Sequence, residues 1–140
     1  MNAVVIYESL TGNTRYAAHK ITDVLRGQGV AATTCPVTAI DLSALAAADL
    51  VLVGSWTDGI VIAGQRPGRS GRLAKIPYIV GKRCAVFCTY AINPGRTIDK
   101  MTSIMTSRGG DVIGGMALRR NDLDSAAADF VARVLNAVNA

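Results

Sequence analysis

The fold of this chain is decided by residues 4–21, VVIYESLTGNTRYAAHKI. The stretch begins in an apolar, β-branched run at residues 3–7 without polar alternation, which is typical of a central strand covered on both faces. A polar loop with a glycine follows at residues 9–14, and from residue 13 apolar side chains recur at helical spacing. A strand, a polar loop and a helix in this order predict a phosphate cradle, because loop amides, loop hydroxyls and the positive end of the helix dipole all face the anion.

The loop differs from the two common glycine-rich phosphate motifs. The triphosphate motif G-x-x-x-x-G-K-[ST] requires a lysine after its second glycine, and no lysine follows Gly12. The dinucleotide motif G-x-G-x-x-G requires three glycines, and this loop contains one. Hydroxyls take the place of the lysine, so the pattern favours the phosphate monoester of a mononucleotide, bound by hydrogen bonds. The structural alternative is a capped turn after the strand, with Asn13 or Thr14 merely starting a helix.

The same stretch resembles the signature of the flavodoxin family and fills each of its specified positions. These positions are Val5, Ile6, Tyr7, Ser9, Gly12, Thr14, Ala18 and Ile21. The resemblance implies an FMN cofactor and a flavodoxin-like three-layer α/β sandwich, in which a five-stranded parallel sheet of order 2-1-3-4-5 carries helices on both faces. Because no long insertion interrupts the fifth predicted strand, the chain resembles a short-chain flavodoxin along nearly its whole length.

Strands and helices alternate along the rest of the chain, which predicts a parallel sheet with right-handed crossovers. The predicted strands are 3–7, 30–36, 50–54, 84–89 and 111–117. The predicted helices are 13–26, 41–48, 93–108 and 124–138. Between the third and fourth strands, residues 55–72 are expected to form a long loop that ends in a helical turn.

Length and composition argue against several other classes of protein, such as membrane proteins and metal-binding proteins. The chain has 140 residues, half of them apolar, so we expect one domain over residues 1–140. No apolar run is long enough for a membrane span, and no secretory leader precedes the first strand, so a cytoplasmic location without membrane contact is expected. The three cysteines form no C-x-x-C and are expected to be buried free thiols. With His19 as the single histidine, we expect neither a metal site nor a catalytic residue.

Three loops are expected to leave the carboxyl edge of the sheet, where ligands of doubly wound folds bind. They comprise residues 9–14, 55–64 and 89–95. We expect cofactor contacts from Ser9, Leu10, Thr11, Gly12, Asn13, Thr14, Ser55, Trp56, Thr57, Asp58, Gly59, Thr89, Tyr90, Ala91 and Asn93. Residues 60–63, IVIA, form an apolar patch that is expected to pack on the core, with the flavin edge and a dimer contact as alternatives.

Trp56 and Tyr90 are the large aromatic residues of the second and third loops. Large aromatic rings in loops usually pack against another apolar group, and a planar tricyclic ring is one such group. The resemblance implies that the two rings sandwich the isoalloxazine of FMN, whereas the alternative is that each packs on the base of its loop. It also implies that Gly59 hydrogen-bonds the reduced ring, although a tight turn explains this glycine equally well.

The charge of the chain departs from that of familiar flavodoxins, which are usually acidic. The net charge is +5, the isoelectric point is about 9.4, and residues 60–98 contain no acidic residue. That basic span holds Arg66, Arg69, Arg72, Lys75, Lys82, Arg83 and Arg96. It predicts either a solvated face or a docking surface for an acidic redox partner or a phosphorylated substrate. Nucleic acid is not expected as a partner, because no recognition module accompanies the charge.

The sequence therefore predicts an FMN-binding electron carrier that shuttles electrons between redox partner proteins, as a monomer or a homodimer. A second hypothesis is an FMN-dependent NAD(P)H:quinone reductase on the same fold, which needs no dedicated base because the flavin performs the chemistry. A third hypothesis is a flavin-free module that binds a protein. The intact loop at residues 9–14, called the phosphate loop below, argues against this hypothesis.

Overall fold

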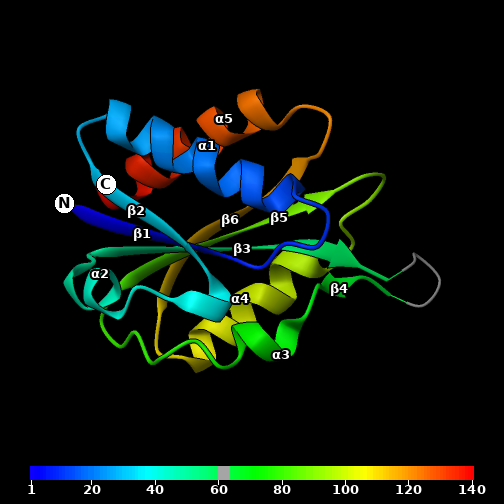
Figure 1. Cartoon of the computed structure of the whole chain (residues 1–140), viewed down its shortest axis with the longest axis horizontal. Coiled ribbons are helices and arrows are strands. Elements are labelled where there is room, and N and C mark those ends of the chain that lie inside the picture. The colour runs from blue at the N-terminus through cyan, green and yellow to red at the C-terminus, as the bar shows by residue number, and fades with distance from the viewer. Residues whose placement is uncertain (60–63) are drawn as a thin grey trace.

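Five parallel strands form the main path of the sheet in the computed structural model, which describes residues 1–59 and 64–140 (Figure 1). The strands are β1 (Asn2–Tyr7), β2 (Ala31–Pro36), β3 (Leu50–Asp58), β5 (Arg83–Tyr90) and β6 (Asp111–Arg119). Their order is β2-β1-β3-β5-β6, which confirms the predicted order 2-1-3-4-5, because β5 and β6 are the fourth and fifth parallel strands along the chain. The order reverses between β1 and β3, so the carboxyl ends of these strands bound the crevice where such folds bind ligands.

Helices cover both faces of the sheet, which confirms the predicted three-layer sandwich (Figure 1). One face carries α1 (Asn13–Gly27) and α5 (Leu123–Val138), which pack against each other. The other face carries α2 (Leu42–Ala47), α3 (Ser70–Leu73) and α4 (Thr97–Ser107), and a 3-10 turn, η1 (Val37–Ala39), precedes α2.

The central strands are buried on both faces because their side chains alternate between two apolar clusters. Val5, Leu52 and Phe87 lie in the cluster beneath α1 and α5. Ile6 and Val53 lie in the opposite cluster, together with the methionines of α4. Each fully buried apolar side chain of this size contributes about 1.5–3 kcal/mol to folding. This burial fixes the ends of the strands from which the predicted site loops leave.

β3 is longer than the sequence predicts. A loop is expected from Ser55 onward, whereas the strand continues to Asp58 and pairs antiparallel with β4 (Arg66–Pro67). Polar side chains conceal this extension, because the apolar run that indicates a buried strand ends at Gly54. The helical turn expected at the end of the loop is present as α3. Residues 60–63 lie outside the described residues, so their packing stays a prediction.

α4 begins at Thr97, later than the predicted start at residue 93. Residues 93–95 form a turn instead, in which the amide of Gly95 donates to Asn93 Oδ1 at 2.7 Å. Gly95 has a φ of +54°, a left-handed conformation that no helix interior contains.

The three cysteines are free and buried, as predicted. Over residues 1–59 and 64–140, no helix has the length and apolar character needed to cross a membrane. The same residues contain no cluster of three or more His, Cys, Asp or Glu side chains that would hold a metal ion.

Candidate functional site

A cavity of about 190 Å³ lies where β1, β3 and β5 end. Its lining residues are Ser9, Leu10, Thr11, Asn13, Thr14, Trp56, Thr57, Thr89, Tyr90, Ala91 and Arg120. All of them except Arg120 belong to the predicted cofactor-binding set. A more open hollow of about 560 Å³ shares Thr11, Asn13 and Arg120 with this cavity. The structure thus brings the three predicted loops together, while their role in binding a cofactor stays a prediction.

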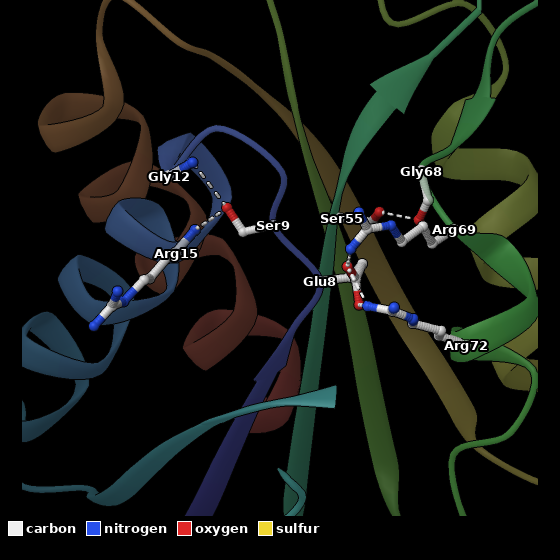
Figure 2. A network of polar contacts seen from close by, with 8 residues as sticks. All are labelled: Glu8, Ser9, Gly12, Arg15, Ser55, Gly68, Arg69 and Arg72. Atoms are coloured by element: carbon white, nitrogen blue, oxygen red, sulfur yellow. Dashed lines mark hydrogen bonds and ion pairs between the residues drawn. The ribbon is translucent and has the colours of Figure 1, made fainter. Parts of the chain in front are cut away.

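Ser9 shapes the loop between β1 and α1. Its Oγ accepts hydrogen bonds from the amides of Gly12 and Arg15, both at 3.2 Å (Figure 2). Gly12 has a φ of +98°, and its carbonyl accepts the first bond of the helix, from the amide of Tyr16 at 2.9 Å. The sequence predicts the Gly12 amide as a phosphate donor, but in the structure this amide is bonded to Ser9.

Other amides of the phosphate loop are available to a ligand. Those that donate no hydrogen bond to any described residue belong to Ser9, Leu10, Thr11, Asn13 and Thr14. They gather at the N-terminus of α1, a helix of 15 residues whose first turn contains no acidic side chain. Unpaired amides at the positive end of a helix dipole form an anion-binding site.

A buried hydrogen bond connects the phosphate loop to the end of β5. The hydroxyls of Thr14 and Thr89 lie 2.9 Å apart, and both side chains line the cavity. Thr14 was predicted as a phosphate ligand, and its hydroxyl can accept the proton of Thr89 while donating its own to a bound anion. The bond fixes the distance between the first and third loops.

Trp56 forms one wall of the cavity near the end of β3. Its indole packs so closely on Gly68 that a Cβ at position 68 would collide with the ring. The carbon of the Arg69 guanidinium lies 5.6 Å from the centroid of the indole, within cation–π range. Gly68 therefore acts as a platform that holds the indole in place, and the half-buried side chain of Trp56 contributes to the cavity surface.

Ser55 has a structural contact in place of the predicted cofactor contact. It is fully buried within β3, and its Oγ donates to the carbonyl of Gly68 at 2.7 Å (Figure 2). The amide of Gly68 in turn donates to the carbonyl of Trp56 at 2.8 Å. Ser55 does not line the cavity, and it acts on the site only by holding the platform beneath Trp56.

Glu8 is a buried acidic residue that sequence reasoning missed. It follows β1 directly and exposes 3% of its side chain. Its Oε1 accepts from Arg69 Nη1 at 2.8 Å, and both of its oxygens accept from Arg72 Nη1 at 3.1 Å (Figure 2). A signal was available, because Glu8 is a single carboxylate at the end of an apolar strand, and residues 60–98 contain seven Lys and Arg residues with no acidic residue among them.

Most of the predicted basic span is bonded to the protein itself. Arg69 and Arg72 bind Glu8, as described above, and the exposed Arg66 lies 3.5 Å from Asp58. The other residues of the span that have partners are Arg96 with Asp99, Lys82 with the carbonyls of Ala46 and Ala48, and Arg83 with the carbonyl of Val138. Arg69 and Arg72 are thus held by Glu8, whereas Arg66 and Arg96 expose 55% and 79% of their side chains, and docking of an acidic partner stays a prediction.

The third loop supplies Tyr90 and Ala91 to the cavity. The carbonyl of Tyr90 accepts the amide of Arg120 at 2.9 Å, which holds the loop after β6 beside it. Arg120 is the cationic side chain among the lining residues, and it was not predicted, because no motif after the fifth predicted strand indicates a site.

Asp58, Gly59 and Asn93, also predicted to bind the cofactor, do not line the cavity. The amide of Gly59 donates to Asp58 Oδ1 at 3.0 Å. Gly59 has a φ of +95°, and a Cβ there would collide with the carbonyl of Gly64, so the turn explains this glycine. The Asn93 side chain closes the turn before α4, and the backbone carbonyl of Asn93 accepts from Gln65 Nε2 at 3.0 Å.

Cys88 lies behind the cavity wall and is unsuited to chemistry there. Burial raises the pKa of its thiol to about 11, although a hydrogen bond from Thr57 Oγ1 at 3.8 Å opposes this shift. Burial also raises the pKa of Cys84 to about 12. Both thiols are neutral near pH 7, so neither acts as a nucleophile.

The parallel sheet of order β2-β1-β3-β5-β6, with a cavity at its switch point, defines a flavodoxin-like α/β protein. The family model of the flavodoxin domain matches residues 4–107, from β1 to the end of α4. The chain belongs to the flavodoxin family.

Solved structures of similar fold include flavodoxins and a larger enzyme. Oxidised flavodoxin 1 from Bacillus cereus is 21% identical, with a TM-score of 0.73 over 97% of this chain and 98% of that one. Two-electron reduced flavodoxin from Megasphaera elsdenii is 22% identical, with a TM-score of 0.69 over 91% and 98%. The rubredoxin oxygen:oxidoreductase of Desulfovibrio gigas is 18% identical with a TM-score of 0.69, and the match covers 99% of this chain but 37% of that one. No curated protein matches the sequence.

Proposed function

We propose that this chain binds FMN at the carboxyl edge of its sheet and carries electrons between redox proteins. One observation supports this proposal above the others. A loop with unpaired amides at a helix N-terminus and two aromatic residues, Trp56 and Tyr90, line the same cavity. The first group suits a phosphate and the second suits a flat ring, and FMN contains both.

The donor set of the phosphate loop fits a phosphate monoester. The unpaired amides, the hydroxyls of Ser9, Thr11 and Thr14, and the helix dipole all supply positive potential. Ser9 Oγ already accepts two amides, so its own proton remains for a phosphate oxygen. Arg120, at the border of the cavity and the open hollow, adds a formal charge that complements the dianion.

The ring of the cofactor would lie between Trp56 and Tyr90. Stacking on these side chains buries apolar area and excludes water from the ring faces. When bound, the flavin supplies the one- and two-electron chemistry, and the protein supplies orientation and electrostatic environment. No carboxylate, histidine or cysteine is among the lining residues, so this chain's own groups support electron transfer rather than acid–base chemistry.

Exposed apolar residues on two of the loops that line the cavity favour a protein as the redox partner. Leu10 is 60% exposed and Ile92 is 89% exposed, and they belong to the loops that follow β1 and β5. Large exposed apolar side chains beside a cofactor site are typical of a docking surface. Because the chain carries a net charge of +5, we propose an acidic surface on that partner.

The proposal is tested by titrating apo-protein with FMN and with riboflavin. We expect FMN to bind with a dissociation constant at least tenfold lower, because hydrogen bonds to a charged phosphate contribute about 1.5–3 kcal/mol each. A failure to bind either flavin would contradict the proposal and favour the flavin-free module. Rapid turnover of NADPH with a quinone, without a separate reductase, would favour the reductase hypothesis.

A further inference from the structure

The buried carboxylate of Glu8 belongs to a network whose function the phosphate loop does not explain. Glu8 lies outside the cavity lining, and its amide donates to the carbonyl of Gly54 at 2.9 Å. Its side chain points instead toward the segment that precedes and begins α3, where it meets Arg69 and Arg72 (Figure 2). A carboxylate with so little exposure to water is stable as an ion only when it is paired and hydrogen-bonded.

Two contacts connect this network to Trp56. The Arg69 guanidinium lies over the indole at 5.6 Å, and the preceding residue, Gly68, is the platform on which the indole packs. Gly68 is bonded through both of its backbone groups, by Ser55 Oγ at 2.7 Å and to the carbonyl of Trp56 at 2.8 Å. A displacement of residues 68 and 69 would therefore displace the ring.

The backbone of Arg69 shows that this segment is held in place. Arg69 has a φ of +47° and a ψ of +48°, and no other described non-glycine residue has a positive φ. This left-handed conformation is unfavourable for a residue with a Cβ, and it persists where surrounding contacts maintain it. The bond from Arg69 to Glu8, at 2.8 Å, is such a contact.

We propose that Glu8 is a positioning residue that fixes Trp56 as a wall of the cavity, acting through Arg69 and Gly68. Its carboxylate fixes Arg69, the fixed segment keeps Gly68 beneath the indole, and the ring is oriented before any ligand arrives. The flavin-related part of this inference rests on the proposed function, whereas the orientation of Trp56 does not.

The test combines the tryptophan emission of apo-protein with flavin titration. Trp56 is the single tryptophan, so the emission has one source. We expect Glu8→Gln to shift this emission to longer wavelength, to increase its quenching by acrylamide and to raise the dissociation constant of FMN about tenfold. Arg69→Met should act in the same direction. Arg72→Met, which removes the two bonds of Arg72 to Glu8 but not the cation over the ring, should act more weakly.

Lys82→Met is the matched control, because the head group of Lys82 also donates hydrogen bonds within the protein. Its acceptors are the carbonyls of Ala46 and Ala48 at the end of α2, and Lys82 precedes β5 at the end of the sheet opposite to Trp56. This variant should lower stability without changing the emission of the folded protein. If Glu8→Gln behaves like Lys82→Met, Glu8 is only structural and the inference is overturned. If Glu8→Gln does not fold, an Arg69→Met protein with wild-type emission overturns it equally. If wild-type protein binds no flavin while Glu8→Gln shifts the emission, the orientation of Trp56 by Glu8 is supported and the proposed function fails.

Discussion

The hydroxyls of Thr14 and Thr89 lie 2.9 Å apart in the interior, and the bond between them joins the start of α1 to the end of β5. These residues are 75 positions apart along the chain. Thr14 carries one of the unpaired amides of the phosphate loop, and Thr89 precedes Tyr90. Through this bond, the position of the proposed phosphate site is linked to the position of the proposed ring site.

Thr14→Ala should weaken the binding of FMN by about 1–3 kcal/mol, because a hydroxyl that bonds a charged phosphate is lost. Riboflavin, which lacks the phosphate, should lose much less affinity, and only through the broken bond to Thr89. Isothermal titration of both flavins measures the difference. Thr14→Ser keeps the hydroxyl and is the control. Equal losses for both flavins would show that Thr14 acts through Thr89 alone.

Trp56 should report directly on flavin binding. Adding FMN to apo-protein should quench the tryptophan emission, because the indole would stack on the flavin. Trp56→Ala should loosen FMN by about 1 kcal/mol or more and raise the potential of the fully reduced step, since a dry, electron-rich ring disfavours added negative charge. Trp56→Phe should have an intermediate effect. Unquenched emission at saturating FMN would place Trp56 away from the ring and leave Tyr90 as the stacking residue.

Gly68→Ala tests the platform beneath Trp56. A Cβ at position 68 would occupy the place of the indole, so the ring must move. We expect altered tryptophan emission and weaker FMN binding in a protein that remains folded. Gly71→Ala is the control, because the structure leaves open space for a Cβ at this position in α3. Identical spectra for the two variants would contradict the described packing.

The ion pairs of the basic span should differ widely in their contribution to stability. Reversing both Arg69 and Arg72 to Glu should lower the free energy of unfolding by about 2–4 kcal/mol, because the buried carboxylate of Glu8 loses its partners. Arg66→Glu should change it by at most about 1 kcal/mol, since its pair with Asp58 is exposed on both sides. Urea denaturation measures both. Equal effects would show that the burial of Glu8 has no energetic consequence.

An acidic redox partner should be recognised by exposed arginines that do not bind Glu8. Arg66 and Arg96 expose 55% and 79% of their side chains, so reversing their charge should slow association at low salt without changing FMN affinity. Arg133→Glu is a control of similar exposure, on α5 and outside the cavity lining. Stopped-flow reduction of a partner protein over a range of salt concentrations gives the rates. If the association rate changes with neither salt concentration nor charge reversal, the basic span is a solvated face and does not dock the partner.

The sequence predicted the sheet order and the place of the site because both follow from local patterns. The apolar runs of the strands and the signature in residues 4–21 act over short distances. The extension of β3 was not predicted, because it pairs with β4, which lies beyond a loop in the sequence. Ser55 and Gly12 illustrate a second limit. Both residue types are suited to ligand binding, yet their hydrogen bonds are made within the protein. Only the structure shows which partner each polar group binds.

Glu8 and Arg120 were missed for a related reason. Each becomes part of the site through a neighbour that is far away in the sequence, Arg69 in one case and Tyr90 in the other. A family signature records the positions that a loop needs for its own shape, and position 8 is left unspecified in the signature that this chain fills.

The separation between Glu8 and its partners has a consequence for the order in which the molecule assembles. Arg69 and Arg72 lie 61 and 64 residues further along the chain. Contacts of such long range close a large loop and form late, because chain entropy opposes them until intervening elements are in place. The turn around Ser9 and Gly12 is local and can form early. A chain that ends after α2 contains Glu8 but neither of its two arginine partners nor Trp56.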